Sequence, residues 1–137
     1  MHLPDTSSSL VLRTDFSDGA AWDQVCTAIR KPVGEFRAYV ECVSDSAFEG
    51  FSLEEILALA SESSYRTFLF IVDRVTIADP EHPVLVVDLI EQPGRTFRVV
   101  PGEMWAVENN LSIANMDFAE FAEAVDETGV FRGFSRG

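Results

Sequence analysis

Hydrophobic residues recur at helical spacing in three segments of the chain, residues 22–29, 53–60 and 118–125. In each segment they fall at i, i+3, i+4 and i+7, which places them on one face of an α-helix. Polar residues suited to capping stand at the start of each segment, in chain order Ser17 or Asp18, Ser52 with Glu55, and Asp117 with Glu120. Pro32 and Gly129 are expected to end the first and the third helix.

Two other patterns predict five β-strands. Residues 10–12, 68–72 and 84–87 are continuous hydrophobic runs, which are typical of strands that are buried on both faces in the middle of a sheet. Residues 36–42 and 96–99 alternate between hydrophobic and polar side chains. Because alternation indicates one covered face or an edge position, we expect these two segments at the margins of the sheet.

The lengths of the connections predict how the strands are joined. The first two connections each contain a helix, so strands one to three can be parallel with right-handed crossovers. The connection from strand three to strand four is short, and residues 92–95 have the composition of a turn, so strands three to five are expected to form an antiparallel meander. The predicted fold is α+β with an α/β-like amino-terminal half. It has a five-stranded mixed sheet in the order 2-1-3-4-5 and three or four helices packed on it.

Two stretches are less regular. Residues 102–114 fit both a helix and a strand, and we expect a short helix followed by irregular chain. Residues 1–8 are expected to be a flexible leader, and residues 9–134 a single α+β domain. The hydrophobic segment that follows Gly129 is expected to fold back onto the domain and bury Phe131.

The chain is strongly acidic, with 23 Asp and Glu against 10 Lys and Arg and a formal net charge of −13. Such a surface repels phosphate groups and anionic lipids, so neither a nucleic acid nor a membrane is expected as a partner. The longest hydrophobic run is too short to span a bilayer, and the amino terminus lacks a secretory signal. We therefore expect a cytoplasmic protein, with Cys26 and Cys42 as buried, reduced thiols.

The predicted topology brings acidic residues to the carboxyl edge of the sheet. Asp15 and Asp73 follow the first and third strands, His82 precedes the fourth, and Glu103 follows the fifth. Ligands of open sheets with parallel strands bind at this edge, where the strand order reverses. Since clustered carboxylates need a cation or a shared proton, one hypothesis is a small enzyme that depends on a divalent cation. The alternative is that these residues cap helices, contact solvent and pair with arginines.

The distribution of charge supports a different hypothesis, a non-enzymatic module that binds a basic protein. Residues 38–65 and 103–127 contain acids but no Lys or Arg, and complementary charge accelerates association with a basic partner. The candidate contact residues are Asp45, Glu49, Glu54, Trp105, Glu108, Asn109 and Asn110. Such a module could be an immunity protein, an antitoxin or a regulator, and it needs no cofactor. The alternative is that the charge only keeps the protein in solution, as a monomer or as a weak dimer through the second strand.

Four strings carry a resemblance to a known family. They are Leu-Val-Leu-Arg-Thr-Asp-Phe-Ser-Asp at 10–18, Asp-Pro-Glu-His-Pro at 79–83, Pro-Gly-Arg-Thr-Phe-Arg-Val-Val-Pro at 93–101, and Glu-Asn-Asn-Leu-Ser-Ile-Ala-Asn-Met-Asp-Phe at 108–118. In these strings the chain resembles a family of short uncharacterised proteins from actinobacteria such as Streptomyces. The resemblance implies a bacterial, cytoplasmic setting. It carries no established activity, so no catalytic residue follows from it.

Overall fold

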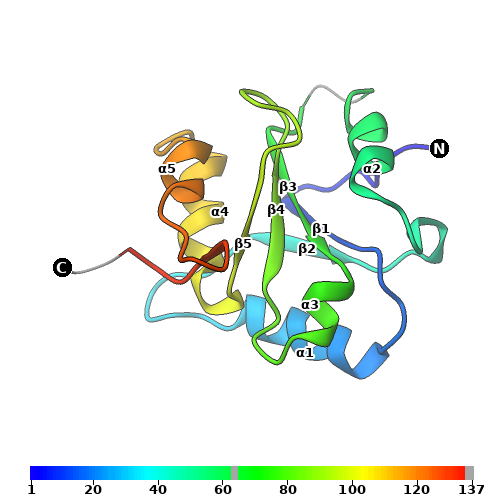
Figure 1. Ribbon diagram of the computed structural model, residues 1–137, viewed down its shortest axis with the longest axis horizontal. Coiled ribbons are helices and arrows are strands. Elements are labelled where there is room, and N and C mark those ends of the chain that lie inside the picture. The colour runs from blue at the N-terminus through cyan, green and yellow to red at the C-terminus, as the bar shows by residue number, and fades with distance from the viewer. Residues whose placement is uncertain (63–64, 135–137) are drawn as a thin grey trace.

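A computed structural model describes residues 1–62 and 65–134 of the chain. Over these residues the centre of the fold is a six-stranded sheet in the order β2-β1-β3-β4-β5-β6 (Figure 1). The strands are β1 Ser9–Arg13, β2 Val40–Val43, β3 Phe68–Val72, β4 Val84–Asp88, β5 Thr96–Val99 and β6 Val130–Phe131. The sheet is mixed, because β1 runs parallel to β2 and β3, β3 to β5 are antiparallel neighbours, and β6 runs parallel to β5.

The predicted order of the first five strands is confirmed, but the predicted number of strands is wrong. Val130 and Phe131 pair with Arg98 and Val99 and so add a sixth strand outside β5. β5 is therefore an inner strand, and its alternating pattern arises because Phe97 and Val99 are buried while Thr96 and Arg98 are only half-buried. A two-residue strand is too short to show a period in the sequence, and it is defined only by its pairing partner.

Five α-helices and two 3₁₀ helices surround the sheet in the described part of the chain. They are α1 Gly19–Arg30, η1 Ser46–Phe48, α2 Leu53–Ala60, α3 Arg74–Ala78, η2 Pro101–Glu103, α4 Met104–Ser112 and α5 Phe118–Ala122. The three helices predicted from hydrophobic spacing are all present. Their caps are also confirmed, since Asp18 caps α1 and capping boxes begin α2 and α5.

Several boundaries differ from the prediction for local reasons. Helix α3 was not expected. It is short enough, at five residues, to fit inside the connection, and Asp73 stabilises its start as the N-cap. Residues 102–114 do contain a short helix followed by irregular chain, since α4 ends at Ser112, and within it Asn110 donates to the carbonyl of Ala106 one turn earlier. Helix α5 ends at Ala122 instead of continuing to residue 125, because the chain must turn near Gly129, whose φ is +82°, to reach β5. The second strand begins only at residue 40, after an exposed loop.

The sheet separates two hydrophobic cores. Alternate residues of β3 point to opposite faces, with Phe68, Phe70 and Val72 in one core and Leu69 and Ile71 in the other. Helices α1, α4 and α5 contribute to the first core, while α2 and the 3₁₀ helix η1 cover the second face, as Figure 1 shows for α2 on one side and α4 and α5 on the other. The continuous hydrophobic pattern of β3 thus follows from its central position.

The carboxy-terminal segment folds back onto the first core, as the sequence predicts. Phe131 is fully buried, and its ring lies edge to face with Phe121 at 5.2 Å between centroids. Burial of such a ring stabilises the fold by about 1.5–3 kcal/mol. Arg132 follows at once and forms ion pairs with Glu81 and Asp126. Phe134 remains about half exposed, although its ring contacts the rings of Phe121 and Phe131.

The amino-terminal residues 1–8, expected to be a leader, contact the domain at several points. Leu3 is 6% exposed and belongs to the second core. Ser7 donates from its backbone N–H (2.9 Å) and its hydroxyl (2.8 Å) to Glu41 of β2. These two hydrogen bonds hold the pKa of Glu41 below its usual range. These contacts hold Ser7 against β2, the edge strand of the sheet.

Candidate functional site

At the carboxyl edge of the sheet, Asp73 and Arg98 are bonded to each other. Asp73 accepts hydrogen bonds from Nη1 (3.0 Å) and Nη2 (2.8 Å) of Arg98 on β5, and it also caps α3. Arg98 further donates to the carbonyl of Pro83 at 3.1 Å. Burial alone raises the pKa of Asp73, but the hydrogen bonds and charge of Arg98 together with the bonds from Thr76 outweigh it, so the pKa lies below its usual range.

The other metal-site candidates have separate partners. Asp15 accepts a hydrogen bond from the backbone N–H of Ser17 at 3.0 Å. The Nδ1 atom of His82 lies 2.8 Å from the carbonyl oxygen of Thr76, and Glu103 lies against the backbone of Gly133. Within residues 1–62 and 65–134, no group of three or more His, Cys, Asp or Glu side chains has the arrangement of a metal site. The divalent-cation enzyme stays a prediction, and calorimetric titration with magnesium, manganese, zinc and calcium tests it.

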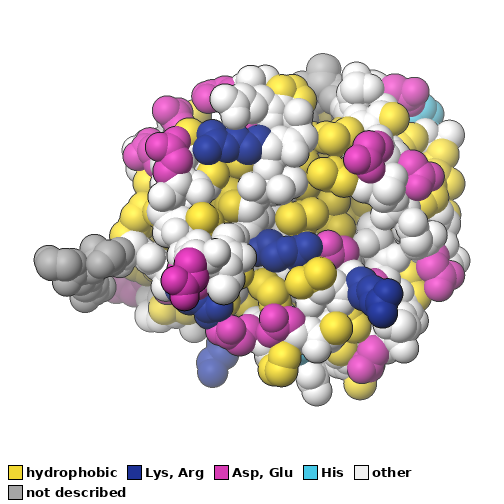
Figure 2. Space-filling model, in the orientation of Figure 1, with side chains coloured by type: hydrophobic (Ala, Val, Ile, Leu, Met, Phe, Trp, Pro, Cys, Tyr) yellow, Lys and Arg dark blue, Asp and Glu magenta, His cyan; other side chains and the backbone are white. Residues whose placement is uncertain are grey.

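The protein-binding candidates divide into two groups. Asp45, Glu49 and Glu54 are exposed around η1 and the start of α2. Together with Glu55 and Glu62 they form what we call the acidic face, and none of these five pairs with a Lys or Arg among the described residues. On the face that Figure 2 draws, acidic side chains surround a central area of hydrophobic side chains, and Lys or Arg side chains lie within and beside that area.

The second group has structural contacts within the domain. Glu108 is only 3% exposed, and Asn110 bonds to the backbone of its own helix. Asn109 donates to the carbonyl of Arg37 at 3.0 Å, which ties α4 to the loop before β2. Glu108 and Asn109 therefore join α4 to its surroundings, whereas the side chain of Asn110 bonds within the helix.

Trp105 packs against the exposed loop before β2. Its ring stacks on Phe36 with centroids 4.7 Å apart and planes 17° from parallel. The indole N–H is buried and has no hydrogen-bond partner among the described residues. Such a group costs free energy, so the stacking and burial of the large ring must compensate for it.

The two thiols are neighbours across the first core. Cys26 of α1 is buried, whereas Cys42 of β2 is half-buried, and both are free. A hydrogen bond with Cys42 and burial raise the pKa of Cys26, and the same bond lowers the pKa of Cys42. Of the two thiols, Cys42 therefore loses its proton more readily.

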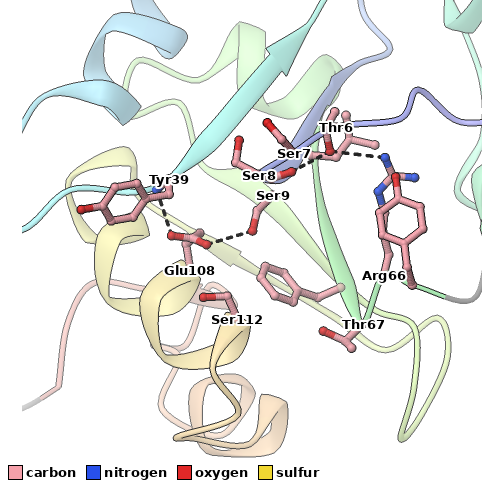
Figure 3. A pocket seen from close by; sticks show the side chains of 12 residues that line it. Thr6, Ser7, Ser8, Ser9, Tyr39, Arg66, Thr67, Glu108 and Ser112 are labelled. Atoms are coloured by element: carbon pink, nitrogen blue, oxygen red, sulfur yellow. Dashed lines mark hydrogen bonds between the residues drawn. The ribbon is translucent and has the colours of Figure 1, made fainter.

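A pocket of about 460 Å³ opens at the opposite edge, where the parallel strands begin (Figure 3). Its lining comes from the amino ends of β1 and β3, the residue before β2, and α4. The lining residues are Thr6, Ser7, Ser8, Ser9, Leu10, Tyr39, Tyr65, Arg66, Thr67, Phe68, Glu108 and Ser112. In Figure 3, Glu108 and Arg66 lie on opposite sides of the pocket, with the hydroxyl residues 6–9 between them. We call this the amino-end pocket.

The carboxylate of Glu108 is fixed by three neutral donors. Its Oε1 accepts from the backbone N–H of Tyr39 at 2.8 Å and from Nδ2 of Asn109 at 3.0 Å, and its Oε2 accepts from the hydroxyl of Ser9 at 2.9 Å. These bonds join α4 to the starts of β1 and β2. Because the donors carry no charge, they satisfy the carboxylate without neutralising it.

Most of this pocket was not predicted from the sequence, and only Glu108 stood among the candidates. The serine and threonine residues at 6–9 were assigned mainly to the leader, and Arg66 and Thr67 to a connection. A signal was present, because both groups of polar residues immediately precede parallel strands. The amino ends of neighbouring parallel strands meet at one edge, so polar residues there also converge.

The fold is a mixed α+β architecture with one hydrophobic core on each face of the sheet. The sequence of residues 8–134 matches the family described as Domain of unknown function (DUF6924), and the chain belongs to that family. A search of curated proteins finds no match to the chain. None of the described helices is long and apolar enough to cross a membrane. The actinobacterial origin and the cytoplasmic location remain predictions.

Proposed function

We propose that this domain is a non-enzymatic module that binds a basic protein through its acidic face. The observation that carries the proposal is the set of exposed carboxylates around η1 and α2 that have no Lys or Arg partner. The side-chain carboxylates of Glu49 and Glu54 make no hydrogen bond or ion pair with any described residue, so both remain available to a partner. Unpaired carboxylates of this kind attract a positively charged surface and accelerate association.

Hydrophobic residues beside the acidic face support the same proposal. Phe51, Leu53 and Leu57 are only half-buried where they pack against the second core. Leu57 also lies close to the hairpin between β4 and β5, since a Cβ atom at Gly94 would stand 3.2 Å from its Cδ1. Protein interfaces combine a hydrophobic centre with a polar rim, and this area offers both.

A partner of this chemistry is consistent with an inhibitory role. An immunity protein or an antitoxin that neutralises a basic nuclease needs an acidic surface to take the place of the acidic substrate. A regulator of a basic protein needs such a surface for the same electrostatic reason. The role needs no cofactor and no catalytic residue. Electrostatic steering also predicts that association slows as the salt concentration rises.

The test compares two double variants with the same change in charge. In Glu49→Gln/Glu54→Gln the acidic face loses two carboxylates, whereas in the control Glu35→Gln/Glu127→Gln two exposed carboxylates are lost elsewhere. Affinity capture from the source organism should recover one basic protein with the wild type and with the control. The acidic-face variant should fail to capture that protein. Added salt should weaken capture of the same protein by the wild type. Recovery of only acidic proteins, or equal recovery by both variants, would contradict the proposal.

A further inference from the structure

Two opposite charges face the amino-end pocket without a counter-ion of their own. Glu108 is 3% exposed, and the bonds it accepts come from the neutral groups of Ser9, Tyr39 and Asn109. Arg66 donates to the carbonyl of Pro4 and the hydroxyl of Thr6, which are also neutral. Neither residue forms an ion pair with any described residue, and they lie too far apart to pair with each other.

Each charged group retains bonding capacity toward the pocket. The Oε2 atom of Glu108 accepts only from Ser9 among the described residues. Both hydrogen bonds that Arg66 donates to Pro4 and Thr6 come from Nη2. The N–H groups of Nε and Nη1, which bond to no described residue, are therefore free to donate to a ligand. A carboxylate has about four acceptor positions and a guanidinium has five donors. Charge-assisted bonds to a ligand would therefore add to the existing bonds rather than replace them.

We propose that the amino-end pocket binds a small zwitterion of about dipeptide size, with the ligand's carboxylate at Arg66 and its ammonium group at Glu108. The separation of the two side chains requires a ligand whose charges are several bonds apart. The volume of about 460 Å³ is within the range of small-molecule sites. Hydroxyl groups of Ser8 and Thr67 are placed for the polar backbone of such a ligand, while Leu10 and Phe68 offer apolar contact.

Ligands with only one kind of charge fit this pocket less well. A polyanion such as a phosphate would meet the buried carboxylate of Glu108 in a chain whose net charge is −13. A simple cation would leave Arg66 without an anion. A zwitterion neutralises both groups at once, and the low dielectric around a buried carboxylate strengthens that attraction.

The first test uses ligands that differ in one charge. Calorimetric titration would compare L-alanyl-L-alanine and 5-aminopentanoate with N-acetyl-L-alanyl-L-alanine, L-alanyl-L-alanine amide and inorganic phosphate. At least one free zwitterion should bind saturably, and removal of either charge should weaken binding at least about tenfold. The proposal is overturned if neither zwitterion binds, if the blocked peptides bind as well as the free one, or if phosphate binds more tightly.

The second test assigns each ligand charge to its side chain. Arg66→Gln should weaken binding of the free dipeptide to that of its amide, and Glu108→Gln should weaken it to that of the N-acetyl form. Arg74→Gln, an exposed arginine at the opposite edge, is the control and should bind like the wild type. Because Glu108 also joins α4 to the strands, circular dichroism must confirm that Glu108→Gln is folded, and Arg66→Gln decides the matter if it is not. A folded Arg66→Gln that still prefers the free dipeptide over the amide would refute the assignment.

Discussion

The two edges of the sheet hold similar charged residues in different electrostatic states. At the carboxyl edge, Arg98 and Asp73 form a bidentate pair with N···O distances of 2.8 Å and 3.0 Å. At the amino edge, Arg66 and Glu108 line one pocket but remain apart and bond only to neutral groups. A charged residue in a ligand site must keep part of its bonding capacity free, and Arg66 and Glu108 do so whereas Asp73 and Arg98 are bonded to each other.

The carboxyl edge of this sheet differs from that of a fully parallel open sheet. A general rule about open sheets places ligands beyond the carboxyl ends of parallel strands. In this fold β4 returns antiparallel to β3, and the connection between them contains α3. Thr76 of that connection is fully buried, and its hydroxyl lies 2.9 Å from the carbonyl oxygen of Pro83. The connection therefore packs closely against the carboxyl end of β3.

The largest expected effect comes from Glu108→Ala. The change leaves the backbone N–H of Tyr39 and the hydroxyl of Ser9 without their acceptor at a buried position. We expect the free energy of unfolding to fall by about 2–4 kcal/mol. Urea denaturation measures it, with Glu127→Ala as an exposed control that should change little. If both variants are equally stable, Glu108 does not join α4 to the sheet as described.

The carboxyl edge should respond less strongly to loss of its arginine. Arg98→Gln removes the partner of Asp73, whose side chain is 26% exposed, and should lower the free energy of unfolding by about 1–3 kcal/mol. The control is Arg95→Gln, because Arg95 pairs with Glu123 at 3.8 Å on the surface and such pairs contribute about 0–1 kcal/mol. Chemical denaturation of both variants measures the contribution of the Asp73–Arg98 pair against that of the Arg95–Glu123 pair on the surface. Equal losses would show that the Asp73–Arg98 pair is no stronger than a surface pair.

The same ion pair predicts how stability depends on pH. The folded-state pKa of Asp73 is lower than its unfolded value, which is about 3.9. Its contribution to stability is therefore fully present above that unfolded value and is lost as the pH falls through the folded pKa. Denaturation curves between pH 6 and pH 3 should show a smaller acid loss for Asp73→Asn than for the wild type. Asp5→Asn, an exposed control, should follow the wild type.

The smallest effect is expected at the arginine of the amino edge. Arg66→Gln removes hydrogen bonds to Pro4 and Thr6 but breaks no ion pair, so the free energy of unfolding should change by about 1 kcal/mol or less. Thermal unfolding of Arg66→Gln beside Arg98→Gln compares the same substitution at both edges. If Arg66→Gln lowered the free energy of unfolding more than Arg98→Gln does, Arg66 would have a structural role and the contrast between the two edges would be wrong.

The regular parts of the fold were predictable because their signals are local. Helix α2 has its capping box and its hydrophobic face within nine residues, 52–60, and β3 has an uninterrupted apolar run. The order of the first five strands followed from connection lengths and burial. The sixth strand was missed because Val130 and Phe131 carry no period of their own, although the burial of Phe131 was predicted correctly.

The candidate site was less predictable than the fold. The sequence shows that Asp73, Glu108, Arg66 and Arg98 are charged, but a charge has no fixed role until its neighbours are known. Asp73 meets Arg98 across 25 positions, and Glu108 meets Ser9 across 99. Contacts over such separations depend on the register of strands and on the packing of α4.

The sequence by itself determined the acidic charge, the positions of the capped helices, the buried strands and the order of most of the sheet. These properties depend on residue type and on spacing within about a dozen positions, where backbone geometry sets the period. Only the tertiary structure decided which charges are paired and where a pocket opens. The reason is that pairing, desolvation and cavity shape arise from residues far apart in the chain, and their distances are fixed only when both cores are packed.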